Sequence, residues 1–292
     1  TDGKLTPIQG EWMEGHLSAA EYGNRMRLNY YVGKALGGAE GERYISRCFR
    51  EIRKAVLEPV ARQWKRKTDS RIVQEECTVK LPLRLNWGGG WSDTPPYCCE
   101  NGGTVLNAAV LLNGQMPVTV RLAKLNESRV VLSSADMGVY GEFYSIEGLQ
   151  SVGDPYDPYV LQKAALIACG IIPENGGNLE AVLAGMGGGF QMDTEVVGVP
   201  KGSGLGTSSI LAAACVKALF AFTGAECAEQ DIYSRVLAME QIMSTGGGWQ
   251  DQVGGLTPGI KYITTMPGLV QDIRVEPVRM TDAARQELDS RL

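Results

Sequence analysis

Hydrophobic positions follow a helical period in the N-terminal quarter of the chain. Between residues 45 and 64, apolar side chains recur every three or four positions, which predicts an amphipathic helix. The apolar positions are Ile45, Cys48, Phe49, Ile52, Val56, Val60 and Trp64. Arginines and lysines lie between them, so one interpretation is a basic amphipathic helix that binds a membrane or a partner protein. The favoured interpretation is a helix that packs on the main domain with its basic face in solvent. Pro59 should kink or divide the helix.

From Glu75 onward, alternating strand-like runs are interleaved with helical ones. The alternation predicts strands over 77–86, 117–122 and 129–134, a glycine-led strand over 187–199, and a strand pair over 256–265 and 270–278. Helical spacing predicts helices over 159–168 and 232–243. This mixture of elements predicts an α+β fold with a largely antiparallel sheet.

Composition narrows the class of protein. The chain has 292 residues, of which 44% are hydrophobic and 21% charged, as in ordinary globular proteins. A net charge of −5 argues against a dedicated nucleic-acid binder. The longest apolar run, 210–222, contains Lys217 and falls short of the roughly 18 residues that a membrane span needs. We therefore expect neither a nucleic acid nor a membrane as partner.

Cysteine and histidine usage narrows the chemistry. The seven cysteines are scattered without metal-ligand spacing, and no secretory signal precedes the polar N-terminus, so we expect a reducing, cytoplasmic setting. The chain has one histidine, His16, which disfavours a serine–histidine mechanism and a histidine-built zinc site. Acid–base chemistry should therefore fall to carboxylates, lysine or tyrosine.

A glycine-rich segment, Gly-Ser-Gly-Leu-Gly-Thr-Ser-Ser at 202–209, precedes an apolar run that predicts a buried helix. Glycines permit positive φ and a close backbone approach, and a helix N-terminus attracts anions, so the segment predicts a phosphate site. The spacing matches neither the lysine-containing phosphate loop nor the dinucleotide fingerprint. The alternative is a flexible loop capping an ordinary helix. The predicted phosphate-binding residues are Gly202, Ser203, Gly204, Leu205, Gly206, Thr207, Ser208 and Ser209.

Two further segments carry candidate chemistry. Residues 83–96, Leu-Arg-Leu-Asn-Trp-Gly-Gly-Gly-Trp-Ser-Asp-Thr-Pro-Pro, place the cation Arg84 before a rigid turn with Asp93. Asp93 either accepts sugar hydroxyls or caps the turn's backbone. Residues 240–252 pair Glu240, late on a helix and suited to face Mg²⁺, with Asp251 after a triple glycine. The alternative for this pair is a solvated glutamate and a loop aspartate.

Together the three segments resemble the GHMP kinases, the family of galactokinase, homoserine kinase and mevalonate kinase. The resemblance covers roughly residues 77–274. Gly-Gly-Trp-Ser-Asp-Thr-Pro-Pro, Gly-Ser-Gly-Leu-Gly-Thr-Ser-Ser and Gly-Gly-Trp-Gln-Asp-Gln resemble the L-fucose kinase branch. The resemblance implies a sugar kinase that uses ATP and Mg²⁺ to phosphorylate the anomeric hydroxyl of L-fucose. The alternatives are a heptose 7-phosphate kinase and a non-catalytic sugar or nucleotide sensor.

The resemblance also implies roles for the candidate residues. Asp251 would accept the proton of the anomeric hydroxyl, and Arg84 would orient the reacting oxygen and stabilise the charged form of Asp251. Asp93, with Gly247 and Gly248, would bind the sugar. Ser208 and Glu240 would hold the Mg²⁺ that bridges the ATP phosphates.

The domain organisation follows from the same resemblance. The family's N-terminal domain, similar to domain 2 of ribosomal protein S5, should occupy 76–275. Residues 1–75 would form a helical extension, interpreted as a linker to a fused upstream domain. Residues 276–292 would begin an incomplete ferredoxin-like C-terminal domain, because no third glycine-rich motif follows.

Overall fold

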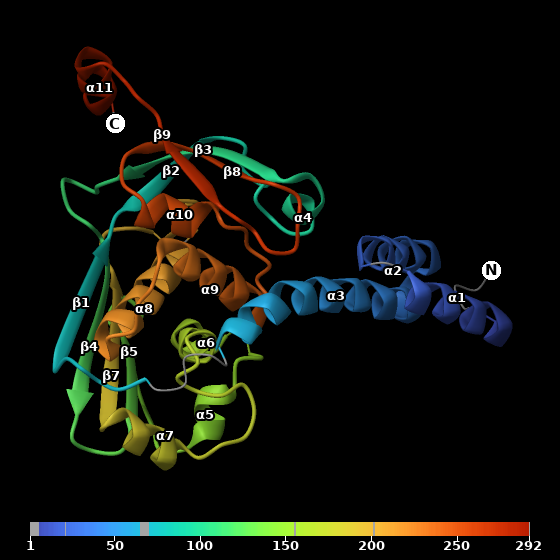
Figure 1. Ribbon diagram of the computed structural model, residues 1–292, viewed down its shortest axis with the longest axis horizontal. Helices are drawn as coiled ribbons and strands as arrows, with labels where there is room; N and C mark the ends of the chain where they lie inside the picture. Colours follow the sequence, from blue (N-terminus) through green and yellow to red (C-terminus); the bar gives the residue numbers. More distant parts are fainter. Residues whose placement is uncertain (1–5, 21, 65–69, 155, 201, 292) are drawn as a thin grey trace. The chain divides into compact units, whose positions relative to one another are not determined.

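The computed structural model describes residues 6–20, 22–64, 70–154, 156–200 and 202–291 (Figure 1). The chain divides into two compact units, residues 1–62 and 63–292. Among the described residues, no helix is both long enough and apolar enough to cross a membrane.

The first unit is helical, with α1 at Pro7–Ala19, α2 at Tyr22–Leu36 and α3 at Gly38–Trp64. Thr6 and Gln9 form a capping box at the start of α1, which satisfies two backbone donors. Helix α3 runs through Pro59 to its end, so the predicted division at Pro59 is wrong. A proline removes one backbone hydrogen bond, and the other bonds of this 27-residue helix maintain it.

Ion pairs tie the helices of this unit together. Arg47 on α3 contacts Glu14 on α1 at 2.6 Å, and Arg25 on α2 contacts Glu51 on α3 at 2.8 Å. Of the apolar positions predicted on α3, Cys48, Ile52 and Val56 are buried, whereas Phe49 is exposed. Arg47, one of the basic residues of α3, thus forms its ion pair within the helical unit itself.

The second unit contains two sheets. Sheet A has the order β1-β4-β7-β5-β6, and sheet B has the order β2-β3-β8-β9. Every pairing is antiparallel except that of β5 with β7, which is parallel. The bounds in sheet A are β1 Glu76–Leu81, β4 Val118–Leu125, β5 Val130–Ser134, β6 Val139–Phe143 and β7 Gly189–Val196, and in sheet B β2 Leu83–Gly88, β3 Gly103–Val110, β8 Ile260–Thr265 and β9 Arg274–Pro277. The predicted α+β class is confirmed.

The strand predicted over 77–86 is in fact two strands that belong to different sheets. β1 ends at Leu81 and β2 begins at Leu83, so the chain changes sheet at Pro82. A proline has no N–H to donate to a strand ladder, which explains the interruption. This change of sheet places Arg84 on sheet B.

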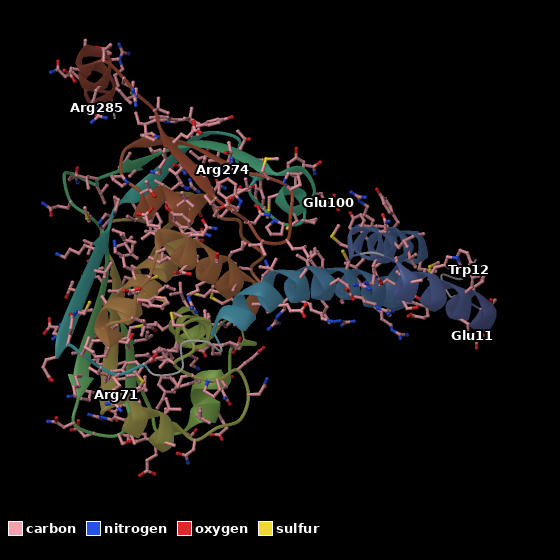
Figure 2. The ribbon with its side chains drawn as sticks, in the orientation of Figure 1. Glu11, Trp12, Arg71, Glu100, Arg274 and Arg285 are labelled. Atoms are coloured by element: carbon pink, nitrogen blue, oxygen red, sulfur yellow. The ribbon has the colours of Figure 1, made fainter. Side chains whose placement is uncertain are left out.

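Helix α8, Thr207–Thr223, is the central helix of this unit and contacts β1, β4 and β7 of sheet A (Figure 1). It is apolar on nearly all sides and almost wholly buried, as expected for a helix enclosed by other elements. Figure 2 shows the side chains that fill the space between the helices and sheet A. The other helices are α4 Tyr97–Asn101, α5 Ile146–Gln150, α6 Val160–Ala168, α7 Leu179–Met186, α9 Glu229–Ile242, α10 Gln250–Leu256 and α11 Asp282–Asp289.

Helices α6 and α9 confirm the predictions over 159–168 and 232–243. Helix α10 was not predicted, and its last residue, Leu256, was assigned to a strand that begins only at Ile260. Figure 1 shows α10 next to sheet B, where it contacts β2 and β3 on one side and α8 and α9 on the other.

Candidate active site

Arg84 and Asp251, the two residues that the sequence analysis assigns to catalysis, form an ion pair. Arg84 lies on β2, and Asp251 lies in the first turn of α10. Nε of Arg84 donates to Oδ1 of Asp251 at 2.7 Å, and Nη2 lies 2.5 Å from the same oxygen. Only 11% of the Arg84 side chain and 22% of the Asp251 side chain are exposed. The pair is therefore partly shielded from water. Attraction between opposite charges is stronger in such a shielded place than in water.

The glycine-rich loop lies directly against this pair. Nη1 of Arg84 donates to the backbone oxygen of Gly204 at 3.1 Å. Gly206 precedes α8 in the left-handed conformation with φ +73°, and a Cβ there would lie 2.8 Å from Cγ of Asp251. The unpaired N–H groups at the start of α8 therefore lie beside a carboxylate. The start of α8, where the helix dipole favours an anion, thus lies next to a carboxylate that is chemically able to accept a proton.

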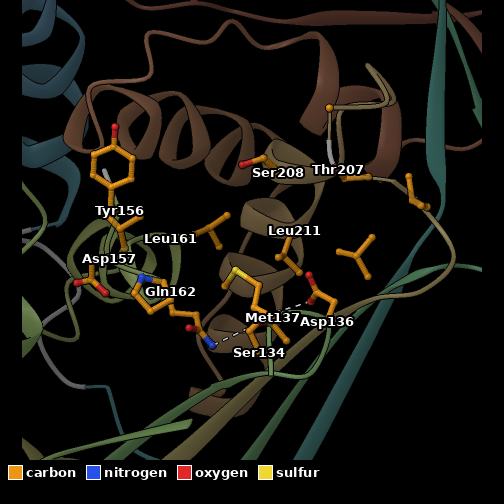
Figure 3. A pocket seen from close by; sticks show the side chains of 16 residues that line it. Ser134, Asp136, Met137, Tyr156, Asp157, Leu161, Gln162, Thr207, Ser208 and Leu211 are labelled. Carbon is orange, nitrogen blue, oxygen red and sulfur yellow. Dashed lines mark hydrogen bonds between the residues drawn. The ribbon is translucent and has the colours of Figure 1, made fainter. Parts of the chain in front are cut away.

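A cavity of about 480 Å³ adjoins the loop (Figure 3). Met137, Val196, Val199 and Leu211 line it with apolar surface, and Thr207 and Ser208 bring the loop to its edge. Its walls also come from α6, through Leu161 and Gln162. A cavity of this size with a few polar groups suits a small ligand. The sequence analysis missed it, because its residues come from segments that are far apart in the chain.

Glu240 lies on α9 with only 5% of its surface exposed. Its Oε1 accepts a hydrogen bond from Oγ of Ser209 at 2.6 Å, and its Oε2 accepts one from Oγ1 of Thr245. Of the serines in the glycine-rich loop, it is thus Ser209 that contacts Glu240, whereas Ser208 is exposed and lines the cavity. Gly247 packs on the same carboxylate, where a Cβ would lie 2.9 Å from its carbon.

The donor set fits a hard cation. No group of three or more histidine, cysteine, aspartate or glutamate residues suited to a metal occurs among the described residues. Mg²⁺ usually takes only one or two carboxylates from a protein, with phosphate and water supplying the other oxygens. One carboxylate, that of Glu240, and the neighbouring hydroxyls are oxygen donors of this kind.

Asp93 is fully buried and holds the start of α10. Its Oδ2 accepts a hydrogen bond from the backbone N of Gln250 at 3.0 Å, and its Oδ1 has no partner among the described residues. Burial raises the pKa of this carboxyl, the Gln250 N–H opposes the rise, and the negative charge of Asp251 adds to it. Asp93 therefore caps the start of α10 rather than its own turn, and its Oδ1 is left as an unused acceptor.

Two asparagines that the sequence analysis did not select also hold α10. Nδ2 of Asn107 on β3 donates to the backbone oxygen of Gln250 at 3.1 Å. Nδ2 of Asn86 on β2 donates to Oε1 of Gln250 at 2.7 Å. The polar side chain of Asn107 within the apolar run Val105–Val110 was the sequence signal that could have revealed this contact.

Comparison with known proteins identifies the class. Residues 177–258 match the model of the GHMP kinases N terminal domain. A D-glycero-D-manno-heptose 1-phosphate kinase from Bacteriodes thetaiotaomicron has a TM-score of 0.54 at 23% identity, over 73% of this chain and 63% of that chain. A mevalonate kinase from Methanococcus jannaschii has a TM-score of 0.51 at 13% identity, over 71% and 57%. These likenesses show the fold, and residues 177–258 carry the GHMP kinase N-terminal domain.

Curated relatives identify the branch. A bifunctional fucokinase/GDP-fucose pyrophosphorylase of Arabidopsis thaliana is 39% identical over 226 residues, 76% of this chain and 20% of the relative. An L-fucokinase/L-fucose-1-P guanylyltransferase of Bacteroides fragilis is 40% identical over 196 residues, 66% and 20%. The chain thus spans about a fifth of the length of these two relatives. The predicted resemblance to the family and to its L-fucose kinase branch is confirmed.

A more distant relative is of the kind considered above as an alternative, a heptose 7-phosphate kinase. A D-glycero-alpha-D-manno-heptose 7-phosphate kinase of Campylobacter jejuni is 27% identical over 214 residues, 73% of this chain and 57% of the relative.

Proposed function

We propose that this protein is an ATP-dependent sugar kinase that phosphorylates the anomeric hydroxyl of L-fucose to L-fucose 1-phosphate. The observation that carries the proposal is the Arg84–Asp251 ion pair beside Gly206 at the start of α8. It combines a proton acceptor with an anion-binding helix end, the two functions that phosphoryl transfer requires. The similarity to two fucokinase-containing enzymes supports L-fucose as the sugar.

ATP would bind across the cavity and the glycine-rich loop. The apolar side chains of Met137, Val196 and Leu211 suit the base, and the loop's backbone N–H groups suit the phosphates. Glu240 and Ser208 would hold Mg²⁺, which supplies charge neutralisation on the phosphates when bound. The reaction then requires mainly positioning of the sugar hydroxyl in line with the terminal phosphate.

Asp251 would accept the proton of the anomeric hydroxyl, and Arg84 keeps that carboxylate oriented through Oδ1. The sugar would lie over the turn at 246–248, because its glycines leave room for close approach. Gly247 and Gly248 would contact the sugar there, and Oδ1 of Asp93, which has no partner among the described residues, would accept one of its hydroxyls.

The proposal is tested by a phosphorylation assay on the intact protein with ATP and Mg²⁺. The sugars are L-fucose, D-galactose, D-arabinose and D-glycero-D-manno-heptose 7-phosphate, and phosphorus NMR locates the new phosphate. We expect the highest kcat/KM with L-fucose and a phosphate on the anomeric carbon. Turnover of the heptose phosphate alone would move the protein to the heptose kinases. ATP binding without turnover of any sugar would favour a sensor.

The role of Asp251 is tested by Asp251→Asn, which removes the proton acceptor and keeps the size of the side chain. We expect kcat to fall by about 100-fold or more, within the range for loss of a general base, while calorimetry shows nearly unchanged ATP affinity. Asp289→Asn, on an exposed position of α11, is the matched control and should behave as wild type. Loss of ATP affinity together with kcat in Asp251→Asn would contradict the assigned role.

A further inference from the structure

Lys261 on β8 is a buried cation that the proposed reaction does not use. Its side chain is among the largest fully buried ones, with 1% of its surface exposed. Nζ donates to the backbone oxygen of Gly254 at 3.0 Å and to that of Gly259 at 3.1 Å. Burial lowers the pKa of this ammonium to about 8, and the negative charge of Glu229 opposes that decrease. A buried charge is costly unless it is hydrogen-bonded, so this lysine requires a structural explanation.

The end of α10 explains why a donor is needed there. In a continuing helix, the oxygen of Gly254 would accept a hydrogen bond from the N–H four residues later. That position is Pro258, which has no N–H. Lys261 supplies the missing donor from the neighbouring strand.

The register of sheet B places a second contact to α10 next to the first. Lys261 is paired with Asn107 across strands β8 and β3. Asn107 donates to the oxygen of Gln250, the first residue of α10, while Lys261 donates to the oxygen of Gly254 near its end. Cross-strand partners share one face of a sheet, so the two side chains hold α10 at both ends.

The short helix is packed closely between two parts of the active site. A Cβ on Gly254 would lie 2.7 Å from Cβ of Arg84, and one on Gly255 would lie 2.8 Å from Ile210 of α8. Asp251 precedes Gly254 by three residues, which places both on nearly the same face of the helix. A shift at Gly254 would therefore move Asp251 relative to Arg84.

We propose that Lys261 is a positioning residue that holds α10 in the place where Asp251 meets Arg84 and the glycine-rich loop. The catalytic consequence rests on the proposed kinase function, whereas the hold on α10 does not. Among the described residues, Lys261 forms no hydrogen bond or ion pair with Asp251 or Arg84, and it acts through the backbone of Gly254.

The first test compares Lys261→Met with Lys80→Met in the intact protein. Methionine keeps an unbranched side chain and removes the charge and the donors, and Lys80 is an exposed lysine on β1. We expect Lys261→Met to lower kcat for L-fucose at least tenfold while KM for ATP changes less than threefold, because misplacement affects the reaction more than nucleotide binding. Lys261→Arg, which keeps donors and charge, should recover part of kcat. Lys80→Met should behave as wild type.

The second test does not depend on activity. Amide hydrogen exchange should become at least tenfold faster over 250–256 in Lys261→Met, while strands β4 and β7 of sheet A keep their protection. If the intact protein phosphorylates no sugar, the kinase proposal fails, and this exchange comparison alone decides whether Lys261 holds α10.

Wild-type kcat and wild-type exchange over 250–256 in Lys261→Met would overturn the inference. If Lys261→Met also loses protection in sheet A, the milder Lys261→Gln is compared in the same way. Faster exchange confined to 250–256 in that variant would support the inference, and unchanged exchange there would overturn it.

Discussion

At the residue scale, the turn at 246–248 lies on two carboxylates and leads to a third. Gly247 packs on Glu240, Gly248 packs on Asp93, and Asp251 lies three residues later in the first turn of α10. Each carboxylate has different partners: hydroxyls for Glu240, a backbone N–H for Asp93 and a guanidinium for Asp251. Different partners give the same functional group, a carboxylate, different tasks.

The two functions of Asp93 can be separated by two substitutions. Asp93→Asn keeps an oxygen that can accept from the Gln250 N–H, so its melting temperature should stay close to that of wild type. Asp93→Ala removes this acceptor and should lower the free energy of unfolding by about 1–3 kcal/mol, the typical cost of an unsatisfied buried group. If Oδ1 binds the sugar, KM for the sugar should rise about tenfold or more in both variants. Equal destabilisation by Asn and Ala would contradict the capping role.

The hydroxyls near Glu240 can be separated in the same way. Ser208→Ala should raise the Mg²⁺ concentration needed for half-maximal activity severalfold, because Ser208 lines the cavity at the loop. Ser209→Ala removes the hydrogen bond to buried Glu240 and should lower the free energy of unfolding by about 1–3 kcal/mol. Magnesium titrations and denaturant unfolding measure the two effects. If only Ser209→Ala changes the Mg²⁺ dependence, Ser209 rather than Ser208 belongs to the metal site.

At the scale of elements, the loop that begins α8 contacts the start of α10 through Gly206. Gly202, Gly204 and Gly206 all have positive φ, a conformation that costs other residues about 1–2 kcal/mol. The loop can therefore curve towards a ligand while its last glycine touches Asp251.

Gly206→Ala tests this contact against Gly202→Ala. Both glycines have nearly the same φ, +73° and +76°, but a Cβ on Gly206 would lie 2.8 Å from Asp251 Cγ, whereas a Cβ on Gly202 meets nothing within 4 Å. We expect similar losses of backbone stability but a kcat at least tenfold lower for Gly206→Ala, measured by turnover with L-fucose. Equal kcat values would show that the contact between loop and helix does not matter for the reaction.

Most elements with a strong local pattern could be predicted. Periodicity located α6, α9 and the strands β4 and β5, and the glycine-rich segment located the start of α8. Helix α10 was missed because Gln-Asp-Gln-Val-Gly-Gly-Leu contains two glycines and lacks helical periodicity. Its helix depends on contacts with Asp93, Asn107 and Lys261, which lie on other elements.

At the scale of the whole molecule, the buried ammonium of Lys261 links folding to pH. Its pKa falls from 10.5 to about 8 on folding, so between these values the unfolded chain binds more protons. The free energy of unfolding should therefore rise with pH in this window through Lys261, by up to about 3 kcal/mol, and stay constant below it.

Lys261→Met removes this dependence. Denaturant unfolding at pH 7.5 and 9.5 should show wild type gaining about 2 kcal/mol relative to the variant at the higher pH, since about 1.5 units of the shift lie below 9.5. Comparing the two proteins cancels the titration of groups that they share. The same difference at both pH values would show that the ammonium titrates as it does in an unfolded chain.

The sequence by itself determined those features that depend only on residues close together in the chain. The period of apolar positions set the α+β class, and the glycines at 202–206 set a loop of positive φ before a helix, because backbone preference acts over a few residues. Short local motifs also led to the selection of Arg84, Asp93, Glu240 and Asp251 as candidate site residues. The same motifs indicated the resemblance to the GHMP kinases.

Only the tertiary structure decided which of these residues meet. Arg84 and Asp251 are 167 positions apart, Ser209 rather than Ser208 lies on Glu240, and a lysine from β8 completes a helix that Pro258 interrupts. These contacts depend on how sheet B, α8 and α10 pack together. Local preference carries no information about such packing, since it is the burial of each element's apolar face that brings distant side chains together.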